Sequence, residues 1–211
     1  VRMHALLRAL ARNTSTEISA TRLSTEAEIE APRGTGVSAQ SVRKYLDALT
    51  RIFVLEEQPA WAPHLRSKVR VRVQPKWHFV DPSLSAAALG ATRSALLDDP
   101  TTLGLLFESL CVRDLRVHGG ALAGKVFHYR DETGLEVDAI VELPNSDWSA
   151  FEVKLGGSES IEHAAGTLTK LAEKVSLKRR ARLRSLNVLT AGNVSFRRSD
   201  GVNVVSLGHI G

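Results

Sequence analysis

The chain has 211 residues, of which 43% are hydrophobic and 24% are charged, so it can bury one large core or two small ones and is too apolar for wholesale disorder. Its single cysteine, Cys111, excludes an intrachain disulfide framework and a cysteine-based zinc cluster, and we expect a reducing cytoplasm. The sequence shows no apolar run of membrane-spanning length and no signal-peptide pattern. The net charge of +5 fits a polyanionic partner such as nucleic acid.

The first third of the chain predicts three helices followed by a two-stranded ribbon. Helical spacing of apolar residues predicts helices at Arg2–Arg12 and Ser19–Ile29, and Ser38 is expected to cap a third helix that ends near Arg51. Alternation predicts strands at Phe53–Glu57 and Val69–Val73. This order is typical of a winged helix, whose third helix often enters a DNA groove. The side chains predicted to contact DNA are those of Gln40, Ser41, Arg43, Lys44, Arg70 and Arg72. The alternative is a structural domain whose third helix packs on a neighbour.

Two basic runs carry much of the positive charge. They are Arg66, Lys68, Arg70 and Arg72 in the first run, and Lys178, Arg179, Arg180, Arg182 and Arg184 in the second. Each run is compatible with a solvated face or with phosphate contacts.

The remainder of the chain alternates between helices and strands. A long helix capped by Thr101 or Thr102 is expected to reach Val117 and to end at Gly119 and Gly120. The other predicted elements are strands at Trp77–Asp81, Val126–Arg130, Leu135–Leu143, Ser149–Leu155, Leu186–Thr190 and Val202–Leu207, a helix at Pro82–Leu89, and a helix capped by Ser158.

Charged residues interrupt two of these apolar strands. Alternation places Val137 and Ala139 on one face and Asp138 on the other, and it places Glu152 and Lys154 together on the face opposite Phe151. Two neighbouring strands would then direct two carboxylates and one ammonium toward a common point. That set suits a hard divalent cation and a phosphate.

Glu108 is a further candidate, because it lies on the apolar stripe of the long helix. A carboxylate among apolar side chains is costly unless it is paired or used. Pairing with Arg113 or Arg116, or contact with water at the edge of the stripe, is the structural alternative.

The order of these elements resembles the PD-(D/E)xK nuclease core, a restriction-endonuclease-like αβββαβ fold. The matching residues are Asp138 and the triplet Glu152-Val153-Lys154, with Glu108 in the helix that precedes the sheet; Val137 stands where the name of the motif has proline. The resemblance implies that Asp138 and Glu152 hold Mg²⁺, with Mn²⁺ as an alternative, and that Lys154 orients the attacking water or stabilises the charge on phosphorus.

Both halves together resemble the C-terminal region of bacterial and archaeal AAA-type ATPases, a domain of unknown function. The phrases that carry this resemblance are Lys44–Leu49, Phe79–Pro82, Phe107–Leu110, Tyr129–Arg130 and Gly134–Asp138. The segment from Thr25 to Gly36 is longer than the family's usual link. The sequence has no Gly-x-x-x-x-Gly-Lys-Ser/Thr motif and begins with valine, so we expect a C-terminal fragment whose partner is an N-terminal ATPase domain of the same polypeptide.

The sequence therefore predicts an α/β protein with a winged-helix domain at residues 1–75 and a nuclease-like mixed-sheet domain at residues 76–211. Two functions are compatible with it. One is a Mg²⁺-dependent phosphodiesterase acting on DNA, and the other is a module that keeps the nuclease fold and binds DNA or protein without cutting.

Overall fold

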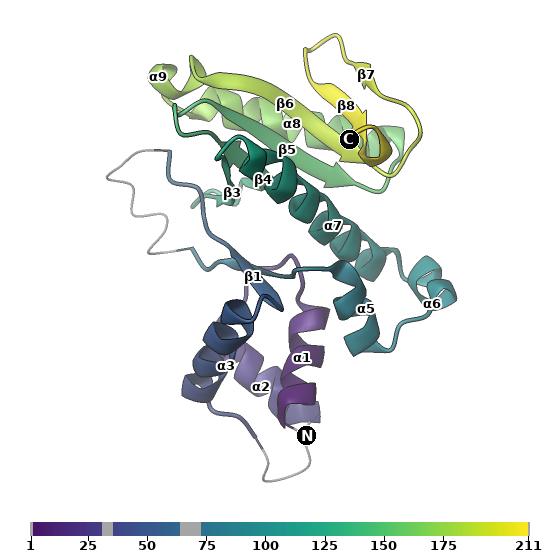
Figure 1. Cartoon of the computed structure of the whole chain (residues 1–211). Coiled ribbons are helices and arrows are strands. Elements are labelled where there is room, and N and C mark those ends of the chain that lie inside the picture. The colour runs from purple at the N-terminus through teal and green to yellow at the C-terminus, as the bar shows by residue number, and fades with distance from the viewer. Residues whose placement is uncertain (1, 31–35, 64–72, 211) are drawn as a thin grey trace. The chain divides into compact units, whose positions relative to one another are not determined.

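The computed structural model describes residues 2–30, 36–63 and 73–210, and the chain is a mixed α/β protein (Figure 1). It divides into two compact units. Unit 1 comprises residues 1–58 and 74–110, and unit 2 comprises residues 59–73 and 111–211. The domain boundary at residue 75, which comes from the sequence, stays a prediction.

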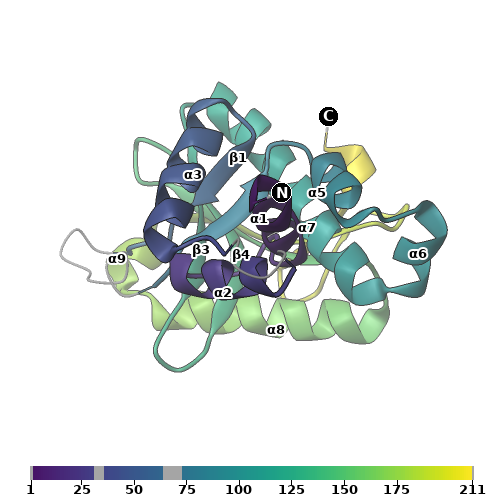
Figure 2. The ribbon, with the colours of Figure 1, turned by 90° about the horizontal axis from the view of Figure 1, so that it is seen from below.

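Unit 1 is mainly helical. Its elements are α1 (Arg2–Arg12), α2 (Ala20–Glu30), α3 (Ala39–Arg51), β1 (Leu55–Gln58), β2 (Lys76–Phe79), α5 (Pro82–Leu89), α6 (Arg93–Asp98) and the first half of α7 (Pro100–Ala121). Helix α1 packs against α2 and α5, and α2 packs against α3 (Figure 2). The core between them contains Leu6, Leu10, Leu23 and Leu46. The short helix α6 was not predicted.

Helix α3 forms as its sequence predicts. The Ser38 side chain accepts a hydrogen bond from the backbone N–H of Ser41, which satisfies a donor that the first turn leaves unpaired. Val42, Leu46 and Leu49 are buried at helical spacing. The helix therefore has one apolar face in the core of unit 1 and one face in solvent.

The ribbon of unit 1 differs from its prediction. Strand β1 pairs antiparallel with β2, with Leu55 opposite Phe79, so its partner lies just beyond the predicted strand Val69–Val73. All of that predicted strand except Val73 lies outside the described residues. Residue Phe53, predicted to start β1, instead has φ of 56° and is exposed, which delays the strand to Leu55.

Helix α7 also differs from its prediction at both ends. The Asp99 carboxylate, and not a threonine, caps it by accepting from the backbone N–H of Thr102 at 3.1 Å. Gly119 and Gly120 lie within the helix and do not end it. A Cβ at Gly119 would lie 3.2 Å from a methyl group of Val141, so glycine permits a close approach of helix to strand there.

Unit 2 contains the sheet. Its elements are the second half of α7, β3 (Lys125–Arg130), β4 (Glu136–Glu142), β5 (Trp148–Lys154), α8 (Ser158–Lys174), α9 (Leu177–Arg180), β6 (Leu183–Thr190), β7 (Phe196–Arg197), β8 (Asn203–Ser206) and a 3-10 turn at Leu207–His209. Within the described residues the sheet has six strands in the order β3-β4-β5-β6-β8-β7. Strands β5, β6 and β8 run parallel, and the other pairings are antiparallel.

Helix α8 connects β5 to the parallel strand β6 and covers one face of the sheet (Figure 1). Its residues Ala165, Leu168 and Leu171 are buried against strand residues that include Ile140 and Val188. At about 25 cal/mol per Å² of buried apolar surface, this core is the main stabilising contribution to unit 2. The helix starts at Ser158 as an ordinary first residue, and its N-cap is Gly157, which corrects the predicted cap.

The segment Pro59–Pro63 is partly ordered by contacts with the sheet of unit 2. Ala60 forms a parallel bridge with His128, and the Trp61 side chain is fully buried. The Trp61 indole lies 4.7 Å from that of Trp148 between ring centroids, and its N–H donates to a Glu142 carboxylate. This proline-rich segment thus contributes a tryptophan to the core of unit 2 without forming a regular strand. The buried indole and its hydrogen bond hold the segment in place.

The turn between β3 and β4 is organised by Asp131. Its carboxylate accepts from the backbone N–H of Thr133 at 2.8 Å, from that of Leu135 at 3.2 Å, and from the ammonium of Lys174 at the end of α8. Burial alone would raise the pKa of Asp131, but these hydrogen bonds outweigh it and hold the pKa far below its usual value. Burial of the phenol, together with the same carboxylate, raises the pKa of Tyr129.

We predict that Asp131→Asn lowers the free energy of unfolding of unit 2 by about 1–3 kcal/mol at pH 7, because charge-assisted hydrogen bonds are lost. A group whose folded pKa is depressed stabilises the fold above its unfolded pKa of about 3.9 and loses this effect as pH falls through the folded pKa. Urea unfolding of both proteins between pH 7 and pH 3 measures the difference, which should shrink below about pH 4.

The matched control is Glu132→Gln, an exposed carboxylate in the same turn. It should change stability by less than about 0.5 kcal/mol at every pH. Equal effects of the two substitutions would contradict the assignment of Asp131 as the organising residue.

Candidate metal and phosphate site

The three residues of the predicted site come together on two paired strands of unit 2. Asp138 lies on β4, and Glu152 and Lys154 lie on β5. The two strands pair antiparallel, and the pairing that lies nearest the site joins Ala139 to Phe151. Continuing this register places Asp138 opposite Glu152.

A β-bulge in β4 directs the Asp138 side chain. Phe127 pairs with Ile140 and Tyr129 with Val137, so β4 has one more residue than β3 over this stretch, at Asp138 and Ala139. The simple alternation expected from the sequence therefore fails here, and Val137 and Ile140 both face the core under α8. Bulges increase the local twist and re-aim side chains, and they are frequent beside active sites.

The Asp138 carboxylate accepts a backbone hydrogen bond of the kind that a carbonyl oxygen accepts between paired strands. Its Oδ2 accepts from the backbone N–H of Val153 at 2.8 Å, immediately beyond the paired residues Ala139 and Phe151. The interaction fixes the carboxylate against the backbone between Glu152 and Lys154. A side chain held by main-chain hydrogen bonds keeps a defined position, as a ligand-binding group requires.

The Lys154 ammonium lies between the two carboxylates. Its Nζ is 2.8 Å from Glu152 Oε2 and 3.6 Å from Asp138 Oδ2. The Glu152 side chain is 6% exposed, the Asp138 side chain 13% and the Lys154 side chain 29%, so the group opens to solvent on the lysine side. Two carboxylate oxygens from neighbouring strands in a partly desolvated place are suitable ligands for a cation.

The donor set fits a magnesium ion. Asp138 and Glu152 supply hard oxygen ligands, and Mg²⁺ commonly binds one or two carboxylates while water and substrate phosphate complete its coordination. Among the described residues, no group of three or more His, Cys, Asp or Glu side chains is placed to hold a metal ion. A structural metal centre with only protein ligands therefore has no counterpart in the described part of the chain.

Glu108, the fourth predicted residue, belongs to unit 1. Its Oε1 lies 2.9 Å from the Nζ of Lys76 on β2, and the two side chains are 12% and 2% exposed. Next to this pair, His78 contacts Gln58 at 2.8 Å and Ser109 at 3.2 Å between polar atoms. Glu108 thus takes part in a buried polar network that joins α7 to the ribbon, and its catalytic role stays a prediction.

The burial of Lys76 could not be predicted from the sequence. Lys76 and His78 alternate with Trp77 and Phe79 along the strand. This pattern is typical of an amphipathic strand whose polar side chains lie in solvent. Both polar residues are nevertheless buried. A carboxylate at an apolar helical position, as Glu108 is, was the available signal that a buried cation exists elsewhere in the unit.

The predicted DNA-contacting residues of α3 share its solvent face. Gln40, Arg43 and Lys44 are exposed, and Ser41 is half-buried beside the cap residue Ser38. Arg70 and Arg72, like the first basic run as a whole, lie outside the described residues. Contact of α3 with DNA stays a prediction.

Much of the second basic run is used in ion pairs within unit 2. Arg179 reaches Glu142 at 2.6 Å and lies over the Trp61 ring, while Arg182 and Arg184 contact Asp147 at 3.5 and 2.7 Å. The hydrogen bond from Arg184 lowers the pKa of Asp147. The Arg182 and Arg184 side chains are 53% and 59% exposed, so a solvated face and phosphate contact both stay predictions for this run.

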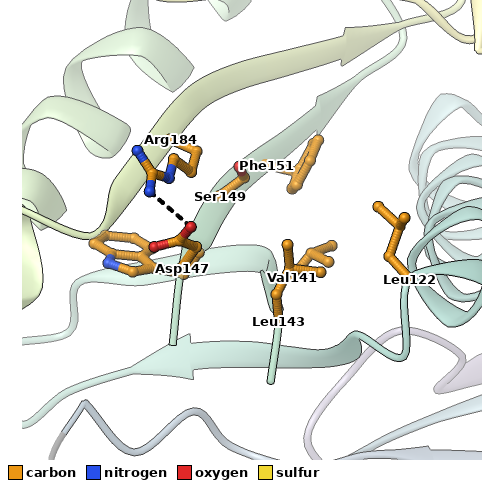
Figure 3. A pocket seen from close by; sticks show the side chains of 8 residues that line it. Leu122, Val141, Leu143, Asp147, Ser149, Phe151 and Arg184 are labelled. Carbon is orange, nitrogen blue, oxygen red and sulfur yellow. Dashed lines mark hydrogen bonds and ion pairs between the residues drawn. The ribbon is translucent and has the colours of Figure 1, made fainter. Parts of the chain in front are cut away.

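Unit 2 also has a hollow of about 160 Å³ lined largely by apolar side chains, among them Leu122, Val141, Leu143 and Phe151 (Figure 3). Phe151 alternates along β5 with Glu152, so the hollow opens on the sheet face opposite the charged group. The Arg184–Asp147 ion pair lies at its rim. The hollow is not part of the candidate site.

The chain belongs to the family described as domain of unknown function DUF4143, whose model matches residues 103–210. A second model, domain of unknown function DUF8612, matches residues 1–95. The region that matches DUF4143 thus includes Asp138, Glu152 and Lys154.

Two uncharacterized proteins, one from Mycobacterium bovis and one from Mycobacterium tuberculosis, are each 28% identical to the chain over 136 residues. The match covers 64% of this chain and 30% of each relative. No solved structure matches the chain. No helix within residues 2–30, 36–63 and 73–210 is long and apolar enough to cross a membrane.

We predict that Glu108→Gln lowers the free energy of unfolding by about 3–5 kcal/mol, because it removes the charge of the carboxylate that contacts the buried Lys76 ammonium. The double variant Lys76→Met/Glu108→Leu should recover most of this loss, since apolar residues of similar volume replace the pair. Chemical denaturation of the single and double variants gives the coupling energy.

The control is Asp47→Asn, which breaks the exposed Asp47–Arg51 pair of α3 at a cost below about 0.5 kcal/mol. A Glu108→Gln protein as stable as Asp47→Asn would show that the Lys76–Glu108 pair does not stabilise unit 1.

Proposed function

We propose that unit 2 is a metal-dependent phosphodiesterase domain that acts on DNA, with Asp138 and Glu152 binding Mg²⁺ or Mn²⁺ and Lys154 contacting the reacting phosphate. The observation that carries this proposal is the meeting of two carboxylates and one ammonium on paired strands beside a bulge. Structural ion pairs rarely need three charges at the open end of a sheet, whereas phosphoryl chemistry needs such a set.

The connectivity of unit 2 supports the same proposal. The order α7, β3, β4, β5, α8, β6, with the pairing β3-β4-β5-β6, agrees with the αβββαβ order of restriction-endonuclease-like folds. In unit 1, three helices followed by the β1–β2 ribbon agree with a winged helix. The exposed Arg43 and Lys44 of α3 would then contact the DNA backbone.

Asp138 and Glu152 would hold the cation in this reaction, and Lys154 would contact the phosphate. A bound Mg²⁺ would polarise the phosphate and lower the pKa of a water molecule. Asp138 keeps its position through the Val153 N–H, so it can bind the cation without rearrangement. The flexible Lys154 ammonium, which is the most exposed of the three, would stabilise the negative charge that develops on the phosphate oxygens.

We place this domain in a longer cytoplasmic protein that resembles AAA-type ATPases. The chain spans less than a third of the length of its curated relatives, and it has no phosphate-binding loop of its own. ATP hydrolysis would therefore be the task of another domain of the same polypeptide. The nuclease-like unit would act where that ATPase remodels DNA.

A non-catalytic DNA- or protein-binding module is the second candidate. It is favoured by the ion pair between Lys154 and Glu152, which occupies a carboxylate that would bind the metal. It is also favoured by the small number of side chains in the described residues that could bind a metal at the site. In such a module the charged group would stabilise the strand ends without performing chemistry.

We predict opposite effects of two substitutions on metal affinity and the same effect on cleavage. Asp138→Asn keeps the acceptor for Val153 but removes a ligand charge, so Mn²⁺ binding should weaken by roughly tenfold or more. Lys154→Met removes the competing ammonium, so Mn²⁺ binding should tighten severalfold. Both variants should lose metal-dependent cleavage of plasmid and oligonucleotide DNA. Titration calorimetry and gel assays measure the two properties.

Glu136→Gln, on β4 and paired with Arg130, is the matched control and should resemble the wild type in both assays. If the wild type binds DNA but cuts no substrate with Mg²⁺ or Mn²⁺, the module is supported and the enzyme is rejected. Unchanged metal affinity in Asp138→Asn would reject the metal site itself.

A further inference from the structure

The parallel strands β5, β6 and β8 end at one edge of the sheet of unit 2, and their last paired residues form a polar row. Lys154 pairs with Thr190, and Thr190 pairs with Ser206. Paired residues of neighbouring strands point to the same face and lie about 4.8 Å apart between backbones. Thr190 is therefore the direct neighbour of Lys154, and Ser206 lies one strand further along the same row.

One step back along the strands the composition is different. Glu152 pairs with Val188, and Val188 pairs with Val204. The two valines belong to the core beneath α8. Since residues two apart share a face, the row of Lys154, Thr190 and Ser206 lies on the α8 side of the sheet at the boundary of that core.

The two hydroxyl groups of this row are held in the protein without hydrogen-bond partners there. Thr190 is 3% exposed and Ser206 is 5% exposed. Within the described chain, no hydrogen bond joins either side-chain hydroxyl to another residue. Neither hydroxyl oxygen is a fully buried atom without a partner, so both reach solvent at this edge of the sheet, where a ligand can contact them.

The first turn of α8 supplies further donors at the same edge. The helix follows β5 directly, and its N-cap Gly157 provides no side-chain hydrogen bond to the first turn. Gly156 and Gly157 have φ of 150° and 92°, conformations that favour glycine. Because glycine has no Cβ atom, no side chain stands at these two positions before the helix. An uncapped N-terminus of a 17-residue helix favours an anion.

We propose that Thr190 and Ser206, with the first turn of α8, bind a phosphate of the DNA strand next to the phosphate that is cut. This inference rests on the proposed phosphodiesterase function and extends its site across β6 and β8. Hydroxyl groups and helix N-termini are regular donors to backbone phosphates, and they position a strand without reading its sequence. The site would thus hold the substrate in register with Asp138, Glu152 and Lys154.

The experiment uses Thr190→Val, which keeps the shape of the side chain, and Ser206→Ala in the 211-residue protein. The probe is a fluorescent 20-base-pair duplex, whose binding is followed by anisotropy in EDTA at several salt concentrations. Each variant should raise the Kd about tenfold, as expected for loss of one hydrogen bond to a charged group. The slope of log K against log salt should not change, because a neutral hydroxyl releases no counterion.

Cleavage kinetics separate positioning from chemistry. With Mg²⁺ or Mn²⁺, both variants should raise KM and leave kcat within about twofold of the wild type. Thr190→Ser keeps a hydroxyl and should restore wild-type binding. Ser185→Ala is the matched control, since Ser185 lies on β6 but alternates to the opposite face and bonds to Ser149.

The outcomes distinguish this inference from the function on which it rests. If the wild type cuts DNA and Thr190→Val and Ser206→Ala bind and cut like it, the phosphate site is wrong while the enzyme stands. If the wild type neither binds nor cuts DNA, both proposals are wrong. Should Thr190→Val fail to fold, Ser206→Ala alone decides, and an unchanged Kd there overturns the site.

Discussion

The hydrogen bond from the Val153 N–H to the Asp138 carboxylate is the interaction on which the candidate site depends. It forms where the β4–β5 ladder ends, so a side chain continues a backbone pairing by one step. The bulge in β4 makes this possible by supplying an extra residue at Asp138. The same geometry leaves Glu152 and Lys154 on either side of the bonded N–H, which places all three charges within ion-pair distance.

Burial makes this arrangement both costly and useful. A carboxylate as buried as that of Glu152 loses hydration worth several kcal/mol, and its contact with Lys154 offsets part of that loss. Because Asp138 adds a second negative charge, the ammonium cannot neutralise the group. Carboxylates in a partly buried place of low dielectric constant interact with a cation more strongly than carboxylates in water do. A sheet that only needed stability would use apolar residues at these positions.

The longer helices and most strands could be predicted from the sequence, because apolar periodicity and the Ser38 cap are local signals, whereas the short α6, α9 and β7 could not. Hairpin order predicts that Asp138 lies near Glu152 and Lys154, but alternation does not place the Asp138 side chain, because β4 is bulged there. The bulge could not be predicted, since an extra residue in β4 leaves no mark that distinguishes it from simple alternation in Leu135–Val141. The pairing of β1 with β2 and the burial of Lys76 also escaped prediction, because they depend on contacts between residues far apart in the sequence. Capping of α7 by Asp99 was missed because three adjacent residues are all good caps.

Two lysine–glutamate pairs show why residue type alone does not reveal function. Lys76–Glu108 in unit 1 and Lys154–Glu152 in unit 2 have nearly equal separations of 2.9 and 2.8 Å. The Lys76 side chain is 2% exposed, whereas that of Lys154 is 29% exposed. An ammonium sealed from solvent can only hold its carboxylate, and it stabilises the packing of α7 on the ribbon. An ammonium that reaches solvent, with a second carboxylate beside it, can exchange its partner for a substrate phosphate. Access to solvent, and not the pair itself, therefore makes the group in unit 2 the better candidate for chemistry.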